Sequence, residues 1–128
     1  MAAASGSLHE SPEDLGPEVI DRHRAILSLM EELEAVDWYD QRVQATQDQE
    51  LRALLAHNRD EEKEHACMMI EWLRRRDPGF RAQLDTYLYC EGDILQAEAG
   101  ATGGSDEAGA TEDDGSLGIG SLKTGVAR

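Results

Sequence analysis

Glu62 and His65 form a Glu-x-x-His pair within "RDEEKEHACMMIEWL" (59–73), a segment whose periodicity predicts a helix. Residues three apart lie on the same helix face, so this carboxylate and this imidazole can bind one cation together. Oxygen ligands with imidazole, and without a thiolate, favour iron, manganese or zinc over copper(I). The pair interrupts the row expected to pack against a partner, where apolar side chains normally lie. That row is Leu51, Leu55, Asn58, Glu62, His65, Met69 and Trp72.

A third candidate ligand, Glu32, interrupts the packing row of an upstream helix. This row is Ala25, Leu29, Glu32, Val36, Tyr39 and Val43. The polar segment "QATQDQE" (44–50) predicts a turn between the helices, and Glu32 and Glu62 each lie fifteen residues from its centre at Gln47. In antiparallel helices both carboxylates then lie level, about 22 Å from the turn. The hairpin therefore predicts a cluster of two carboxylates and one imidazole, which a bound cation would make tolerable.

The elements that position these residues are two long antiparallel helices, about 17–45 and 47–76. Gly16 can cap the first helix, and Pro17 suits its first helical position. Thr46, with Gln49 three residues later, matches a capping box for the second helix, which Pro78 ends. A shorter third helix is expected within 80–99.

The chain divides by composition into four parts and predicts an all-α fold. Residues 1–16 are expected to be disordered, and residues 17–97 to form the hairpin with its short third helix. Residues 98–115 form a flexible acidic linker. Residues 116–128 regain aliphatic side chains spaced by small residues, a pattern that suits an extended peptide docking on a partner. The aliphatic residues are Leu117, Ile119 and Leu122.

Charge and cysteine usage narrow the class of protein. The formal net charge is −15, from 27 acidic and 12 basic residues, which argues against nucleic acid and anionic membranes as partners. The N-terminal residues lack the features of a signal peptide, and no apolar run reaches the length of a membrane span. Cys67 and Cys90 are therefore expected to be reduced thiols in the cytoplasm.

The predicted hairpin holds half of a known kind of metal site. Di-iron carboxylate bundles use one Glu from each of two helices and a Glu-x-x-His from each of two others, and this chain has one of each. Two helices also cannot enclose a core, so a two-fold dimer would complete both a four-helix bundle and the site. Three alternatives stay open on these residues. Glu62 and His65 could take part in an interhelical salt bridge or lie in a wet dimer seam, the site could belong to a mononuclear non-haem iron enzyme, or the chain could be a non-enzymatic acidic helical interaction protein.

Two longer segments resemble a known family. "HRAILSLMEELEAVDWYDQR" (23–42) and "LLAHNRDEEKEHACMMIEWLRRRDP" (54–78) are similar to the encapsulated ferritins, bacterial ferritin-like proteins packaged inside encapsulin shells. The resemblance covers roughly 17–95, and "LGIGSLK" (117–123) looks like the cargo-loading peptides that dock on the inner wall of such shells. It implies a ferroxidase centre formed between two subunits, a ring-shaped decamer of five dimers, and a cytoplasmic location inside the encapsulin nanocompartment.

The resemblance also implies roles for individual residues. Glu32, Glu62 and His65 correspond to the di-iron ligands, with one iron per subunit, and Tyr39 to the phenol beside the iron, with Trp38 near the site. Glu31 and Glu34 correspond to an outer site for calcium or another divalent cation on the route to the centre. These two carboxylates lie one turn apart and could collect cations through their field, but on sequence alone they also fit an ordinary solvated acidic face. Tyr39 on sequence alone also fits a packing role.

The expected function is that of a ferroxidase, which oxidises Fe(II) to Fe(III) with dioxygen. Carboxylates suit the hard Fe(III) product, and two irons held together can share the electrons delivered to one dioxygen molecule. An open ring of such small chains cannot hold mineral, so storage of the iron is expected to belong to the surrounding shell.

Overall fold

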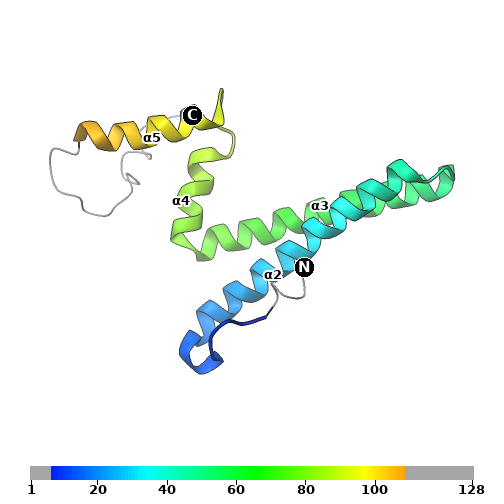
Figure 1. The fold of residues 1–128 in the computed structure, drawn as a ribbon, viewed down its shortest axis with the longest axis horizontal. Helices are drawn as coiled ribbons and strands as arrows, with labels where there is room; N and C mark the ends of the chain where they lie inside the picture. Colours follow the sequence, from blue (N-terminus) through cyan, green and yellow to red (C-terminus); the bar gives the residue numbers. More distant parts are fainter. Residues whose placement is uncertain (1–6, 109–128) are drawn as a thin grey trace. The chain divides into compact units, whose positions relative to one another are not determined.

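The protein is described from a computed structural model, which defines residues 7–108 of the 128. These residues form four helices and no strand, so the predicted all-α class is confirmed (Figure 1). They divide between Arg76 and Asp77 into two compact units. The predicted tail at 116–128, and the last residues of the predicted linker, lie outside the described residues.

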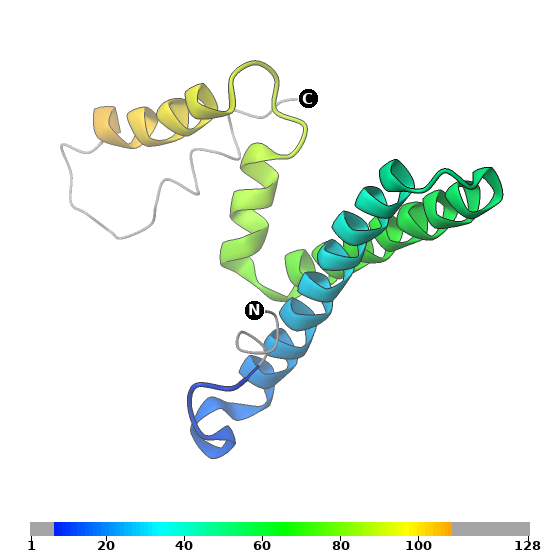
Figure 2. The ribbon, with the colours of Figure 1, turned by 45° about the vertical axis from the view of Figure 1, so that its right-hand side comes forward.

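Helices α2 (Pro12–Ala45) and α3 (Gln49–Arg76) form the predicted hairpin. They run side by side in both views (Figures 1 and 2). Gly16 interrupts α2 with φ 76° and ψ 165°, a conformation that glycine adopts without strain, and the long continuous part of the helix begins after it, as predicted. Ahead of Gly16, Pro12–Leu15 already form a helical turn. The prediction that residues 1–16 are disordered is therefore wrong for this stretch.

Asp48, and not Thr46, caps α3. The backbone N–H of Leu51 donates to Asp48 Oδ1 at 2.9 Å, which is the bond that an N-cap side chain makes to the third helical residue. The side chain of Thr46 accepts from the N–H of Asp48, at 3.2 Å, which lies in the turn, and the N–H of Thr46 ends α2 by donating to the carbonyl of Arg42. The predicted capping box is therefore wrong, because the turn is two residues longer than that motif requires.

The hairpin has little core of its own. Among the described residues the buried apolar side chains are Ala25 on α2 and Ala66 and Leu73 on α3. Large apolar side chains remain exposed along both helices, including Leu33 at 52 %, Leu54 at 57 % and Met68 at 62 %. Exposed apolar area of this extent is unfavourable for an isolated chain. None of the described helices is long and apolar enough to cross a membrane.

An ion pair links the two helices of the hairpin, and a second group of charged residues interacts within the last turns of α3. Arg59 of α3 donates to Asp40 of α2 at 2.9 Å and to the neighbouring Asp60 at 3.0 Å. At the far end of α3, the guanidinium groups of Arg74 and Arg75 lower the pKa of Glu71 to about 2.

The second unit contains two helices where the sequence predicted one. Helix α4 (Pro78–Tyr87) is capped by Asp77, which accepts from the N–H of Phe80 at 3.1 Å. Helix α5 spans Ile94–Ala108. Between them Tyr89 and Gly92 adopt positive φ angles of 61° and 78°, which a continuous helix cannot accommodate.

Helix α5 also runs into residues 98–108, which the sequence analysis assigned to a flexible linker. Asp93 caps the N-terminal end of this helix, because its side chain accepts a hydrogen bond from the N–H of Leu95 at 2.9 Å. The alanines that follow are the strongest helix formers, and they offset the cost of the glycines among them. The prediction of a linker from residue 98 is therefore wrong for its first part.

Candidate metal centre

Glu32, Glu62 and His65 come together at one height of the hairpin. One ligand atom from each lies within 4.8 Å of the others. The Nδ1 atom of His65 lies 3.1 Å from Oε2 of Glu62 and 3.8 Å from Oε2 of Glu32. The sequence predicted this proximity, because Glu32 and Glu62 lie equally many residues from the turn and antiparallel helices rise by the same distance per residue.

The cluster is half-buried and open on one side. The side chains of Glu32 and Glu62 are 27 % and 23 % exposed, whereas that of His65 is 49 % exposed. The two carboxylates are therefore largely enclosed between the helices, while the imidazole borders solvent. An ion bound here would receive three protein ligands from this chain and would have free coordination positions on the open side.

The two carboxylates share a hydrogen bond, which shifts their pKa values in opposite directions. The pKa of Glu32 is raised, first by its hydrogen bond to Glu62 and then by burial and the negative charge of Glu62. The pKa of Glu62 is lowered, first by the same hydrogen bond and then by the bond to His65. The pKa of His65 is raised, mainly because its ring bonds to Glu62. Each shift has the direction expected for neighbouring groups that interact through hydrogen bonds and charge.

The donor set fits a hard or borderline divalent ion. Two carboxylates and one imidazole are ligands that iron, manganese and zinc accept, and a thiolate is not part of the cluster. Cys67, two residues from His65, is a free and exposed thiol, and Cys90 is also free. A divalent ion would bring positive charge to the same oxygen and nitrogen atoms and would compete with protons for them.

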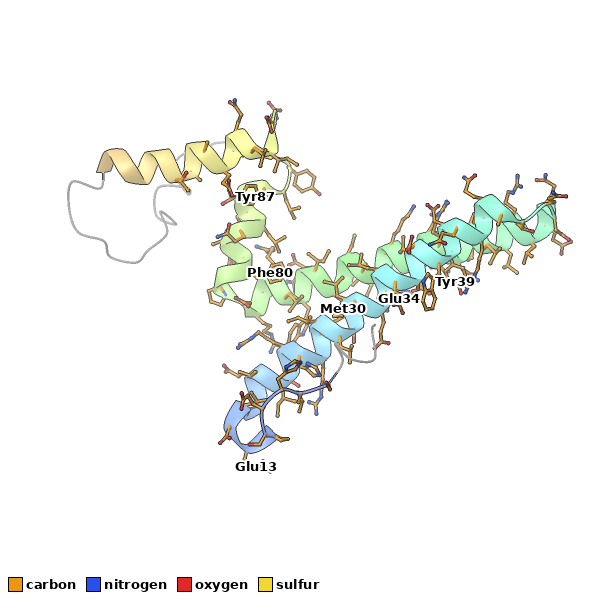
Figure 3. All side chains as sticks on the ribbon, in the orientation of Figure 1. Glu13, Met30, Glu34, Tyr39, Phe80 and Tyr87 are labelled. Carbon is orange, nitrogen blue, oxygen red and sulfur yellow. The ribbon has the colours of Figure 1, made fainter. Side chains whose placement is uncertain are left out.

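The remaining predicted site residues lie on α2 but outside this cluster. Glu31 is exposed and Glu34 is half-buried. Neither joins a group of three metal-ligating side chains in the described part of the chain. Tyr39 lies on the same row as Glu32, two turns and about 10 Å closer to the turn of the hairpin. Glu34 and Tyr39 are labelled on α2 in Figure 3.

Arg42 is a residue whose role the sequence reasoning missed. Its guanidinium carbon lies 5.6 Å from the ring centroid of Tyr39 and 6.0 Å from that of Trp38. These distances are within the range of cation–π interactions, and they order both aromatic rings from one side. The spacing of Trp38, Tyr39 and Arg42, three and four residues apart on one helix, was the available signal.

Comparison with known proteins agrees with this architecture. The family model described as EncFtn-like matches residues 7–91. An "Encapsulated ferritin-like protein" of Rhodospirillum rubrum is 60 % identical over 129 residues, covering 96 % of this chain and 92 % of that protein. The "Encapsulin nanocompartment cargo protein EncC" of Myxococcus xanthus is 38 % identical over 52 residues, covering 41 % of this chain and 40 % of that protein.

A solved structure shares the fold. The crystal structure of protein ne0167 from Nitrosomonas europaea is similar with a TM-score of 0.66 and 57 % identity, and the match covers 69 % of this chain and 97 % of that one. The family model spans most of the chain, including both helices that carry the cluster, and the R. rubrum relative matches nearly the whole length. The chain therefore belongs to the EncFtn-like family, the encapsulated ferritin-like proteins.

Proposed function

We propose that the protein is a ferroxidase, which binds Fe(II) at Glu32, Glu62 and His65 and oxidises it to Fe(III) with dioxygen. The observation that carries this proposal is the meeting of the three ligand atoms within 4.8 Å, from two helices of one hairpin. Family membership supports iron as the ion, since the R. rubrum relative is named as ferritin-like.

Each residue has a distinct part in holding the substrate. Glu32 and Glu62 supply anionic oxygens, which bind Fe(III) more strongly than Fe(II) and so favour the oxidised product. His65 binds as neutral imidazole, so it must release its proton when the ion enters. Each Fe(II) that is oxidised gives up one electron, and dioxygen accepts it.

We propose that the complete centre contains two hairpins. One chain supplies two carboxylates and one imidazole, which is half of the ligand set of a di-iron carboxylate bundle. The open side of the cluster, where His65 is 49 % exposed, is the side from which a second hairpin could approach. The exposed apolar side chains of the hairpin support the same conclusion, because a second copy would cover them. The dimers would then assemble into the decameric ring that the family resemblance implies.

We propose that the shell partner is an encapsulin, bound through Leu117, Ile119 and Leu122. The R. rubrum and M. xanthus relatives carry the words encapsulated and encapsulin cargo in their names. In the cell the protein would then lie in the cytoplasm inside the nanocompartment, and iron oxidised at the ring would be stored in the shell.

An anaerobic Fe(II) titration followed by sedimentation velocity tests the central proposal. Binding of about one iron per chain with conversion to even-numbered assemblies is expected, followed by dioxygen uptake and ferric absorbance on exposure to air. A Glu61→Gln variant is the matched control, because Glu61 is a neighbouring acidic residue that pairs with His57 and lies outside the cluster. Absence of stoichiometric iron binding by the wild type would contradict the ferroxidase proposal and would favour an acidic interaction protein. An iron–iron vector in X-ray absorption distinguishes the di-iron centre from a mononuclear site.

A further inference from the structure

Among the described residues, no carboxylate pairs with the guanidinium of Arg42. Within residues 7–108 its contacts are the ring faces of Tyr39 and Trp38, at 5.6 and 6.0 Å from the centroids. Arg24 and Arg59 of the hairpin do contact carboxylates, at 2.8 Å from Asp21 and 2.9 Å from Asp40. Arg76 is like Arg42 in contacting a ring, that of Trp72 at 5.0 Å. In a chain with 27 acidic and 12 basic residues, an ordered guanidinium whose N–H groups are not engaged is a feature that needs an explanation.

The same residues border a surface hollow. It has a volume of about 310 Å³ and is lined by Trp38, Gln41 and Arg42. Trp38 is 49 % exposed beside it. The amide of Gln41 already donates to Asp37 at 3.1 Å, so the guanidinium of Arg42 supplies the charge of this hollow. Because its contacts in the described part of the chain are with aromatic rings, the guanidinium keeps N–H donors available for a planar carboxylate.

From these contacts we infer that the surface formed by Trp38, Tyr39, Gln41 and Arg42 is the anchor for a second copy of this chain, with Arg42 binding a carboxylate of that copy. Tryptophan, tyrosine and arginine are the residue types most enriched where binding energy concentrates in protein interfaces. The inference rests on the proposed function, because it names the surface that holds together the two hairpins of the metal centre.

Two properties of the hairpin favour a second copy over a small free anion. A carboxylate on a second copy arrives together with apolar surface that would cover the exposed apolar side chains of the hairpin, whereas a small free anion brings none. The anchor surface is also continuous with the metal cluster, since Tyr39 and Glu32 share one row of α2. A copy that covers this row comes within reach of Arg42, which contacts Tyr39.

Charge reversal at Arg42 tests the inference. Arg42→Glu should raise the dissociation constant of the Fe(II)-bound dimer about 30-fold or more in sedimentation equilibrium, the loss expected for an interface hot spot. Arg42→Lys should give a smaller loss, because lysine keeps the charge without the planar fork. The matched control is Arg24→Glu, which makes the same change of charge on the same helix at a residue that is already paired. Unchanged far-UV circular dichroism would show that the helices of each variant are intact.

The outcomes separate this inference from the proposed function. Assembly of Arg42→Glu with the wild-type dissociation constant would overturn the anchor and leave the ferroxidase proposal standing. An equal loss in Arg24→Glu would also overturn it, because the effect would then come from total charge. If inorganic phosphate bound to the wild type and not to Arg42→Glu, with assembly unchanged, the hollow would be an anion site and the anchor would be wrong. If the wild type neither bound Fe(II) nor assembled, the ferroxidase proposal itself would fail.

Discussion

Oε2 of Glu32 on α2 lies 3.8 Å from Nδ1 of His65 on α3, across the interface of the hairpin. The two residues are 33 positions apart in the chain, and the antiparallel pairing of the helices brings them to the same height. Glu62 lies beside both and completes the cluster. The polar residues that interrupt the apolar rows of α2 and α3 therefore lie together and form one candidate binding site.

Replacing any one ligand should nearly abolish oxidation of Fe(II). Outer-shell partners of metal sites typically change affinity or activity about 10–100-fold, so loss of a direct ligand in Glu32→Ala, Glu62→Ala or His65→Ala should cost at least about 100-fold in initial rate. At a two-fold site each substitution removes two ligands. The rate is measured from ferric absorbance after mixing with aerated buffer, with Glu61→Gln as control. Wild-type rates in two of the three variants would refute the site.

Iron binding should weaken as the pH falls through the raised pKa of His65. Its bond to Glu62 favours the imidazolium, so in the metal-free protein the ring should titrate above its usual value of 6.5. Below that pKa a proton competes with the metal for the ring, and the apparent affinity should fall about tenfold per pH unit. NMR of the His65 ring gives the pKa, and anaerobic titrations at several pH values give the affinity.

Glu62→Gln tests whether the bond to Glu62 is what raises the pKa of His65. It removes the negative charge and should lower the pKa of His65. The sign for stability also follows from a raised folded-state pKa: the contribution of the His65–Glu62 bond is fully present below 6.5 and is lost as the pH rises through the folded-state pKa. If the ring titrated at or below 6.5 in the metal-free wild type, the bond to Glu62 would not persist in solution.

Removing the outer carboxylates should affect the delivery of iron and leave its binding at the cluster intact. Glu31→Ala with Glu34→Ala takes away two negative charges from the face of α2 beside the cluster, so the rate at low Fe(II) concentration should fall and the rate at saturation should change little. Crystals soaked anaerobically in Fe(II) should still show iron at Glu32, Glu62 and His65. Loss of that iron would mean that Glu31 and Glu34 belong to the inner site.

Asp48→Ala should destabilise the hairpin by about 1 kcal/mol, the usual cost of losing an N-cap side chain. Thr46→Ala should cost less, because Thr46 bonds to a turn N–H and not to the first turn of α3. Urea unfolding followed by circular dichroism compares the two variants at equal protein concentration. A larger loss for Thr46→Ala would restore the capping box as the start of α3.

Deleting residues 116–128 should abolish packaging and leave oxidation in solution unchanged. The expected docking residues, Leu117, Ile119 and Leu122, lie in this segment, apart from the helices that carry the cluster. Co-expression with an encapsulin and purification of the shells measures packaging. Fusion of the segment to a fluorescent protein is the converse experiment and should make that protein cargo. Normal packaging of the truncated chain would assign targeting to the helices.

The sequence alone determined the hairpin and the height of its metal cluster. Apolar rows with a helical period define which faces of α2 and α3 meet, and the constant rise of a helix makes residue counts from the turn equivalent to distances. The helix face and the distance from the turn both follow from counting residues along the chain, so the proximity of Glu32, Glu62 and His65 could be predicted without a structure. Both ends of the hairpin followed from Gly16, Pro17 and Pro78 for the same reason.

Tertiary structure decided what depends on side-chain geometry and on competition between local signals. Thr46 and Asp48 can both cap a helix, and the length of the turn selected Asp48. The helical periodicity of 80–99 predicts one helix, but the positive φ angles of Tyr89 and Gly92 interrupt it in the structure. The opposite pKa shifts of Glu32 and Glu62 arise mainly from the interaction of their carboxyl groups across two helices, and the cation–π contacts of Arg42 with Tyr39 and Trp38 depend on rotamers. Periodicity fixes the face on which a side chain lies but not its torsion angles, so these contacts could be found only once the helices were packed.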